Sequence, residues 1–317
     1  MERTSFLTVA VFLTLFSLRA TPVRAGTEFT LETAREAAEK GNPGALYFLA
    51  RSYSKGEGVK QNSAQAVDYM RQAAEKGNAA AQQDFGAMYF NGEGVEQDDG
   101  KAVQWFRKAA ERRDPLGEFN LGFMYANGRG IQKDLPQAII WYQKAAAQKE
   151  PNAMMALGYL YMDGTDGTKL DWKEATKWYQ MAAEVGRGEA ANFLGFIYEN
   201  GGLGVDQNLA NSVKYYRQAA ESDDTKGQMN LGRLYDDGKG VAQNSIEAYK
   251  WFLLSSENGN HLANRYMVEL DGSDPVLGQA TATTLSANKL SPEQIAEARQ
   301  RAKAWREAHK TKEKQKE

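Results

Sequence analysis

Residues 119–149 read FNLGFMYANGRGIQKDLPQAIIWYQKAAAQK, and this stretch contains one complete helix–turn–helix unit. Leu121 and Tyr125 are four residues apart, a spacing that puts both side chains on one face of a helix. The two glycines in 128–130 suit a helix end and a turn, because glycine adopts left-handed conformations without strain. Asp134 then stands as a candidate N-cap for the next helix. The stretch therefore predicts a helix, a glycine turn and a capped second helix.

The same unit recurs along the chain. Its tyrosine returns every 36 or 37 residues, at Tyr53, Tyr89, Tyr125, Tyr161, Tyr198 and Tyr235. A second aromatic series keeps step with it, at Tyr69, Trp105, Trp141, Trp178, Tyr215 and Trp251. A fixed period of this length is typical of tandem arrays whose units pack on their neighbours. We predict an all-α solenoid of about six helix–turn–helix repeats, with the six full copies over about residues 44–260, and expect the second helices to bury the second aromatic series.

Two further positions of the repeat carry structural information. The residue three positions before each periodic tyrosine is always small. These residues are Ala50, Gly86, Gly122, Gly158, Gly195 and Gly232. Glycine inside a helix costs about 1 kcal/mol relative to alanine, so its repeated use predicts a helix crossing too close to admit a Cβ atom. The candidate N-caps of the second helices are Asn62, Asp98, Asp134, Asp171, Asn208 and Asn244.

The array has a distinct boundary at each end, and we place the whole solenoid at residues 26–270. Residues 32–42 repeat the second-helix pattern and form a half-repeat, whereas residues 261–270 resemble a degenerate first helix. A linker rich in small residues follows over 271–290. Ser291-Pro292-Glu293-Gln294 is a well-formed helix start, so we predict a C-terminal capping helix over 291–305. We expect residues 306–317 to be a charged, disordered tail.

Residues 1–25 are predicted to be a signal peptide. The apolar run from Phe6 to Leu18 has 13 residues, which is too short to cross a bilayer comfortably. Small residues allow cleavage after Ala25 or after Ala20, and an uncleaved membrane anchor is the alternative. Removing this segment takes away one acidic and three basic residues, so the formal net charge changes from −2 to −4.

Composition argues against several classes of function. The chain has 39 Lys and Arg against 41 Asp and Glu, so it lacks the basic excess that nucleic-acid binding requires. It has no cysteine, which removes disulfides, thiolate metal sites and thiol nucleophiles. The two histidines, His261 and His309, fall in separate segments. Residues 163–174 resemble a calcium loop only at their two ends, because Thr168 stands where that loop needs glycine. We expect no catalysis, no metal and no cofactor.

The repeated residues resemble Sel1-like repeats, a family related to the tetratricopeptide repeats, over roughly Gly44 to Asn260. The shared pattern is A-x3-LG-x2-Y-x2-G-x-GV-x2-D-x3-A-x2-W-x3-AA, from which the fourth repeat departs at residues 165–168. The resemblance implies a right-handed superhelix whose first helices line a concave face. It also implies an adaptor or regulator of the bacterial envelope that binds a protein partner.

The resemblance leaves other roles open. One is an immunity protein that neutralises a secreted toxin, such as a phospholipase, by occluding it. Another, from a different class, is an envelope enzyme acting on cell-wall material, for which the sequence has no motif. In either of the binding roles the expected location is periplasmic or secreted, without stable membrane insertion after signal cleavage.

Positions that the repeat pattern leaves variable supply the candidate partner-binding residues. Two such positions lie four residues apart on one face of the first helix. Repeats three to five fill them with large, mostly apolar side chains, and an arginine lies towards either end. The candidates are Arg51, Phe119, Phe123, Met155, Tyr159, Phe196 and Arg233. Aromatic residues and arginine are enriched at protein interfaces, so we expect this stripe, on the concave face of the solenoid, to bind an extended segment or a helix of a protein partner. The alternative is that its aromatic residues fill the seams between repeats, which full burial of both Phe123 and Phe196 would favour.

Overall fold

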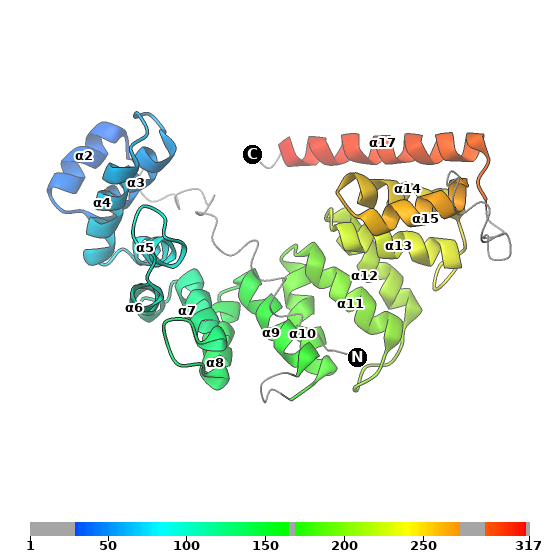
Figure 1. Ribbon diagram of the computed structural model, residues 1–317, viewed down its shortest axis with the longest axis horizontal. Helices are drawn as coiled ribbons and strands as arrows, with labels where there is room; N and C mark the ends of the chain where they lie inside the picture. Colours follow the sequence, from blue (N-terminus) through cyan, green and yellow to red (C-terminus); the bar gives the residue numbers. More distant parts are fainter. Residues whose placement is uncertain (1–28, 165–168, 273–288, 315–317) are drawn as a thin grey trace. The chain divides into compact units, whose positions relative to one another are not determined.

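The computed structural model describes residues 29–164, 169–272 and 289–314, and in these ranges it contains fifteen α-helices (Figure 1). The first helices of the repeats are α3 (Pro43–Lys55), α5 (Ala79–Asn91), α7 (Pro115–Asn127), α9 (Pro151–Asp163), α11 (Gly188–Asn200) and α13 (Thr225–Asp237). The second helices are α4 (Ser63–Glu75), α6 (Asp99–Glu111), α8 (Leu135–Ala147), α10 (Trp172–Glu184), α12 (Leu209–Glu221) and α14 (Ser245–Glu257). Helix α2 (Leu31–Glu39) precedes them, and α15 (His261–Asp271) and α17 (Pro292–Lys314) follow. The prediction of an all-α solenoid is confirmed.

The chain divides into two compact units, residues 1–169 and 170–317. The first unit contains α2 to α9 and the second contains α10 to α17. From α2 to α9 in the first unit and from α10 to α15 in the second, each helix packs against the next helix along the chain, as expected of a tandem array. The predicted signal peptide and its predicted cleavage sites lie outside the described residues, as does most of the predicted linker. Within the described ranges, no helix combines the length and the apolar character that a membrane span needs.

The helix ends form as the sequence predicts. Each predicted N-cap accepts a hydrogen bond from the backbone N–H three residues on, as Asp134 does from Gln137 at 3.0 Å. Five first helices end at a left-handed glycine, for example Gly128 with φ of 67°. The first helices also have polar N-caps that the sequence analysis missed, among them Asn78 and Asp114. Local chemistry therefore fixes most of the helix ends; α11 is an exception, because its N-cap residue Arg187 makes no side-chain capping hydrogen bond.

The prediction of a close helix crossing at the repeated glycine is confirmed in four repeats. A Cβ atom placed on Gly122 would lie 2.8 Å from the ring of Tyr142 and 3.2 Å from the carbonyl oxygen of Ala138. Gly86, Gly195 and Gly232 face an aromatic ring of their own second helix in the same way. The first repeat has a different pair at these positions, with Ala50 opposite Met70, and both residues are buried.

The ring that fills this crossing is not the one that the sequence analysis selected. Met70, Phe106, Tyr142, Tyr179, Tyr216 and Phe252 are buried, and each follows the periodic aromatic residue by one position. Of the periodic series itself, only Trp251 is buried, whereas the other five rings are half-buried at the seams. The expectation that the second helices bury this series was therefore wrong for five of six repeats. The periodic Trp and Tyr rings lie beside the helix crossing, and the residue that follows each of them enters it.

The array ends at α15, where Val268 occupies the position of the glycine in the complete repeats. A ring cannot approach α15 here as Phe252 approaches Gly232. Helix α17 instead packs chiefly across α14 (Figure 1). It begins with a reciprocal cap in which the Gln294 N–H donates to the Ser291 hydroxyl at 3.4 Å and the Ser291 N–H donates to the Gln294 amide oxygen at 2.8 Å.

The C-terminal helix is longer than predicted. We expected disorder from Arg306 onward, but α17 continues to Lys314, so that expectation was wrong up to this residue. Contacts with the repeats explain the difference. Arg306 forms an ion pair with Glu257 at 2.6 Å, and a ring nitrogen of His309 lies 3.2 Å from the carbonyl oxygen of Glu221. These contacts hold a segment that its composition alone marks as disordered.

Candidate protein-binding site

The structure places the candidate residues of the first unit in different environments. Phe119, Phe123 and Met155 are buried, with 2%, 4% and 7% of their surface exposed. The ring of Phe119 lies 5.6 Å from that of Tyr142, and the ring of Phe123 lies 6.0 Å from that of Phe90 in the preceding repeat. These two residues therefore take part in the packing of the unit and present little surface to a partner.

Arg51 and Tyr159 keep part of their surface exposed. The Arg51 guanidinium lies 5.9 Å from the ring centroid of Tyr47, whose hydroxyl donates to the Asp84 carboxylate at 2.7 Å. Burial, together with the charge of Asp84, raises the pKa of Tyr47. Tyr47 thus stays protonated as a hydrogen-bond donor, and Arg51 lies beside a fixed polar pair.

The second unit contains an apolar surface that the sequence analysis found only in part. Phe196 on α11 is 40% exposed, whereas Phe123 at the equivalent position of the third repeat is buried. The ring of Trp172, the first residue of α10, lies 6.1 Å from the ring of Phe196. Leu170 is exposed two residues before Trp172. We call Leu170, Trp172 and Phe196 the repeat-five surface.

Trp172 was missed because its contact with Phe196 joins two repeats and has no signature within either one, and Leu170 lies in the loop before it, outside the helix pattern. One sequence signal was available. The first position of the second helix reads Ser63, Asp99, Leu135, Trp172, Leu209 and Ser245, so only the fourth repeat places an aromatic residue there. Such a departure from the repeat pattern identifies a position that the fold itself does not require.

Arg233, the remaining candidate, is held within the second unit. Its guanidinium contacts both carboxylate oxygens of Glu199, at 2.6 and 2.7 Å, and the Tyr216 hydroxyl donates to the same carboxylate at 3.0 Å. Burial raises the pKa of Tyr216, and the Glu199 carboxylate raises it further. Glu199 lies one helical turn from Phe196, so this network supports the edge of the repeat-five surface. Arg233 is a positioning residue rather than a free cation.

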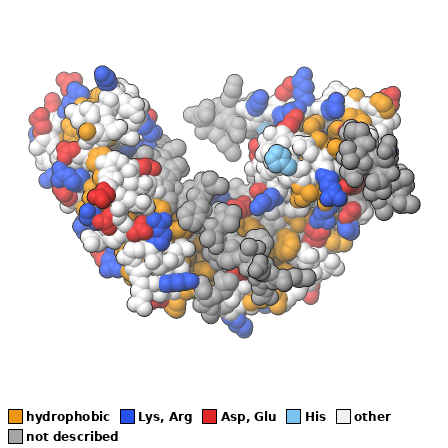
Figure 2. All heavy atoms as spheres, viewed as in Figure 1, with side chains coloured by type: hydrophobic (Ala, Val, Ile, Leu, Met, Phe, Trp, Pro, Cys, Tyr) orange, Lys and Arg blue, Asp and Glu red, His pale blue; other side chains and the backbone are white. Residues whose placement is uncertain are grey.

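The charges of the described residues do not gather into one field on the face shown in Figure 2. Lys and Arg side chains alternate there with Asp and Glu side chains over both units. Nucleic acid needs a continuous basic surface, which is absent from the described residues on this face. Apolar side chains lie among these charges, as on surfaces that bind proteins.

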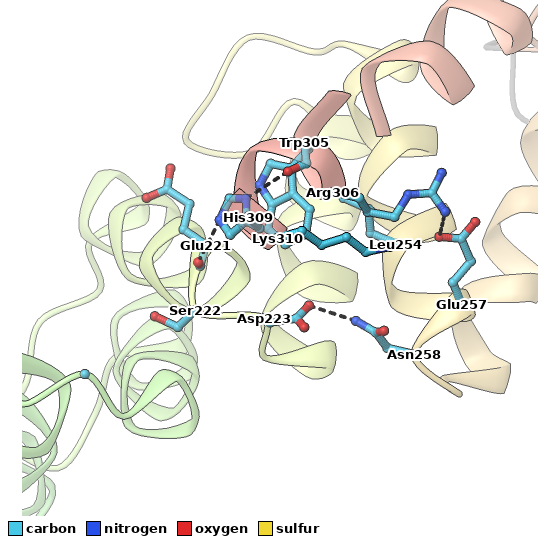
Figure 3. A pocket seen from close by; sticks show the side chains of 11 residues that line it. Glu221, Ser222, Asp223, Leu254, Glu257, Asn258, Trp305, Arg306, His309 and Lys310 are labelled. Atoms are coloured by element: carbon cyan, nitrogen blue, oxygen red, sulfur yellow. Dashed lines mark hydrogen bonds and ion pairs between the residues drawn. The ribbon is translucent and has the colours of Figure 1, made fainter. Parts of the chain in front are cut away.

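A second candidate is a cavity of about 590 Å³ beneath the C-terminal helix (Figure 3). Trp305, His309 and Lys310 line it from α17, and residues 221–223 line it from the turn after α12. The two ring nitrogens of His309 lie 2.9 and 3.2 Å from the carbonyl oxygens of Trp305 and Glu221. His309 is therefore engaged with the backbone on both sides.

The other polar groups of this cavity also have structural partners. Arg306 pairs with Glu257, and the Asn258 amide donates to Asp223 at 2.8 Å. No nucleophile lies beside a base among these contacts, and they fasten α17 to the last two repeats. Elsewhere in the described ranges, no three His, Asp or Glu side chains gather to hold a metal ion.

The comparisons with known proteins agree with this architecture. The Sel1 repeat family model matches six segments, residues 43–78, 79–114, 115–150, 151–186, 188–224 and 225–260. Among solved structures, the chain is similar to a protective antigen of uropathogenic Escherichia coli that displays an SLR fold. The identity is 34% and the TM-score 0.73, over 87% of this chain and 56% of that one, so the chain spans little more than half of that protein's length.

A Sel1 repeat protein from Oxalobacter formigenes is 30% identical, with a TM-score of 0.61 over 87% of this chain and 99% of that one. An immunity protein from Pseudomonas aeruginosa is 21% identical with a TM-score of 0.43, over 68% and 81% of the two chains, which is too distant to bear on function. No curated protein matches the chain. The six consecutive matches cover most of the sequence and coincide with the helix pairs of the structure. The chain belongs to the Sel1 repeat family.

Proposed function

We propose that this chain is an exported, non-enzymatic binding protein of the bacterial envelope, and that a protein partner docks on the repeat-five surface. One observation carries the proposal. Phe196 remains 40% exposed beside Trp172, whereas the equivalent Phe123 is buried. Sel1 repeats serve as scaffolds for interaction, and their shared residues are used for packing. An exposed phenylalanine beside a half-buried tryptophan is therefore the natural place for a partner.

Energetic considerations favour such a pair as an anchor. Aromatic side chains contribute a large contact area with few rotatable bonds, so they lose little conformational entropy on binding. The pair is also fixed in position, because α10 and α11 pack against each other and the Glu199–Arg233 ion pair supports the adjacent turn. A preformed surface of this kind binds without the cost of ordering a loop.

The test is partner capture with the protein from Gly26 onward, using native envelope and secreted fractions. Wild type is compared with Phe196→Ala and with Ile140→Ala, a control that removes an equally exposed apolar side chain (43%) from the third repeat. We expect one stoichiometric partner with wild type and the control, and its loss with Phe196→Ala. Circular dichroism must show that all three proteins are folded. A partner retained by Phe196→Ala would refute the proposed site.

The identity of the captured protein decides the role. An envelope component indicates an adaptor or regulator, and a secreted toxin indicates an immunity protein. Arg51 and Tyr159 remain proposed contacts in the first unit, because both keep exposed surface. Arg51→Ala and Tyr159→Ala test them separately, and loss of the same partner would extend the binding surface to that unit.

A further inference from the structure

Leu203 combines a left-handed backbone conformation with an exposed apolar side chain. Its φ is +50°, and its side chain is 53% exposed. Three other described non-glycine residues have positive φ, namely Arg113, Lys149 and Asp223. All three are polar and occupy the turn before a first helix, where four other such turns have glycine. Leu203 is the apolar member of this group, so repeat geometry does not explain it.

The turn that holds Leu203 is well defined. Gly202 and Val205 exchange two backbone hydrogen bonds, of 2.6 and 3.0 Å, around the central residues Leu203 and Gly204. Both central residues have positive φ, which is the sign pattern of a type I′ turn. Asn-Gly and Asp-Gly are the preferred sequences for this turn, and a leucine in the left-handed region costs free energy. Leu203 is also exposed. Neither the conformational preference of the turn nor burial in the fold therefore favours a leucine at this position.

The loop around Leu203 differs from the equivalent loops of other repeats. In the second, third and sixth repeats, the glycine four residues before the N-cap lies against the second helix of the preceding repeat. A Cβ atom on Gly94 would meet Val67 at 2.7 Å, and one on Gly130 would meet the backbone of Asp99. Gly204 is the equivalent residue here, and a Cβ atom on it would meet nothing within 4 Å.

Two sequence changes accompany this difference. The loop of the fifth repeat has one extra residue, and Trp172 occupies the first helical position, whose backbone meets the glycine in the third and sixth repeats. The loop thus stands away from the preceding helix, at the end of α11 that carries Phe196. An unfavourable residue in a hydrogen-bonded turn of such a loop points to a function outside the fold.

We propose that Leu203 is an anchor that inserts into an apolar pocket of a folded protein partner, next to the contact made by Phe196. This inference rests on the proposed function. The apolar pocket of the partner must fit a branched aliphatic side chain. Residues 201–208 contain Asp206 but no Lys or Arg, so the loop lacks the basic charge that favours an anionic lipid surface. A protein pocket is therefore the chemistry that fits the loop.

The experiment uses a photo-crosslinking amino acid in the full chain, expressed in a bacterium that exports it. It is placed at position 203, at position 196, and as a matched control at position 239, the middle of the corresponding loop in the sixth repeat. We expect the same protein adduct from positions 203 and 196, and none from 239. The crosslinked protein, once identified, is the ligand for affinity measurements with wild type, Leu203→Asn and Lys239→Asn.

Leu203→Asn separates binding from folding, because asparagine suits the turn better than leucine does. We expect affinity to fall by about tenfold or more, as for an interface anchor, while Tm stays equal or rises. Lys239→Asn should leave affinity unchanged. Unchanged affinity of Leu203→Asn, or a fall in its Tm, would overturn the inference, since the second result would give Leu203 a structural role.

The outcomes also distinguish this inference from the proposed function. Adducts from position 196 without any from 203 would refute the role of Leu203 and leave the repeat-five surface in place. An adduct from 203 that contains only lipid would replace the protein partner with a membrane and overturn the inference. Absence of protein adducts at both positions would refute the inference and the proposed function together.

Discussion

Replacing Gly122 with alanine tests the packing principle of the whole array. The Cβ atom of the new residue would lie 2.8 and 2.9 Å from ring atoms of Tyr142 and 3.2 Å from the carbonyl oxygen of Ala138, against an ordinary contact of 3.4 Å or more. Neither neighbour can move easily, because the Tyr142 side chain is buried and the Ala138 carbonyl oxygen is part of the backbone of α8. The two helices must therefore separate locally to admit one methyl group.

Two opposing effects set the magnitude. Alanine is a better helix former than glycine by about 1 kcal/mol, which would stabilise α7. Inserting a methyl group into a filled contact costs about 1–3 kcal/mol when backbone must move. We expect overpacking to prevail, with a net loss of about 1–2 kcal/mol in the free energy of unfolding. Helix propensity alone would instead predict an increase in the free energy of unfolding.

The first repeat supplies a compensating partner. It combines Ala50 with Met70, where the third repeat combines Gly122 with Tyr142. A flexible methionine makes room for a Cβ atom that a rigid ring excludes. The double variant Gly122→Ala/Tyr142→Met should therefore be more stable than the sum of the two single effects predicts, by about 1 kcal/mol.

Urea and thermal unfolding followed by circular dichroism at 222 nm measure this cycle. Gly100→Ala is the matched control, because its Cβ atom would meet only the Asp98 side chain, at 3.3 Å, near the start of α6. We expect the control to be at least as stable as wild type. The reasoning is refuted if Gly122→Ala is as stable as wild type, or if the double variant shows no coupling.

Two further predictions concern a half-buried acid and the C-terminal helix. Burial raises the pKa of Asp224, partly offset by the hydrogen bond from the Gly227 N–H, so the folded state loses stability as the pH rises from the unfolded pKa of about 4 through the folded value. Asp224→Asn keeps a good N-cap and should raise Tm at pH 7 while leaving it unchanged below about pH 4; a Tm difference that does not depend on pH would contradict this. The Trp305 ring lies 5.8 Å from Trp251, so Trp305→Ala should weaken the docking of α17 by about 2–4 kcal/mol and speed tryptic cleavage after Arg301 and Arg306, with the repeats still resistant. Equal cleavage rates in wild type and variant would show that Trp305 does not hold the helix.

The parts of the fold that could be predicted from the sequence are those encoded within one repeat. The Tyr and Trp periods, the N-cap residues and the glycine turns act over a few residues, so the sequence pattern is sufficient to place the helices. The position of the buried ring was off by one residue. A pattern shows that an aromatic residue recurs, but only the helix packing decides whether it or the next residue enters the crossing.

Features that depend on neighbouring repeats were beyond the sequence pattern. Phe123 and Phe196 occupy equivalent positions, and nothing within their own helices indicates that one is buried and the other exposed. The difference accompanies Trp172 in the preceding repeat and a one-residue insertion in the following loop. The charged C-terminal segment likewise becomes helical because Arg306 and His309 contact Glu257 and Glu221 of the last two repeats.

Val268 has a consequence for how proteins of this architecture change in length. The side chain at this position prevents the docking of a second helix that inserts an aromatic ring, as α14 does at Gly232, so a copy of such a helix cannot be added after α15. Duplication of an internal unit that has glycine at this position meets no such obstacle. Growth by gene duplication should then occur in the interior, and both terminal segments should be inherited unchanged.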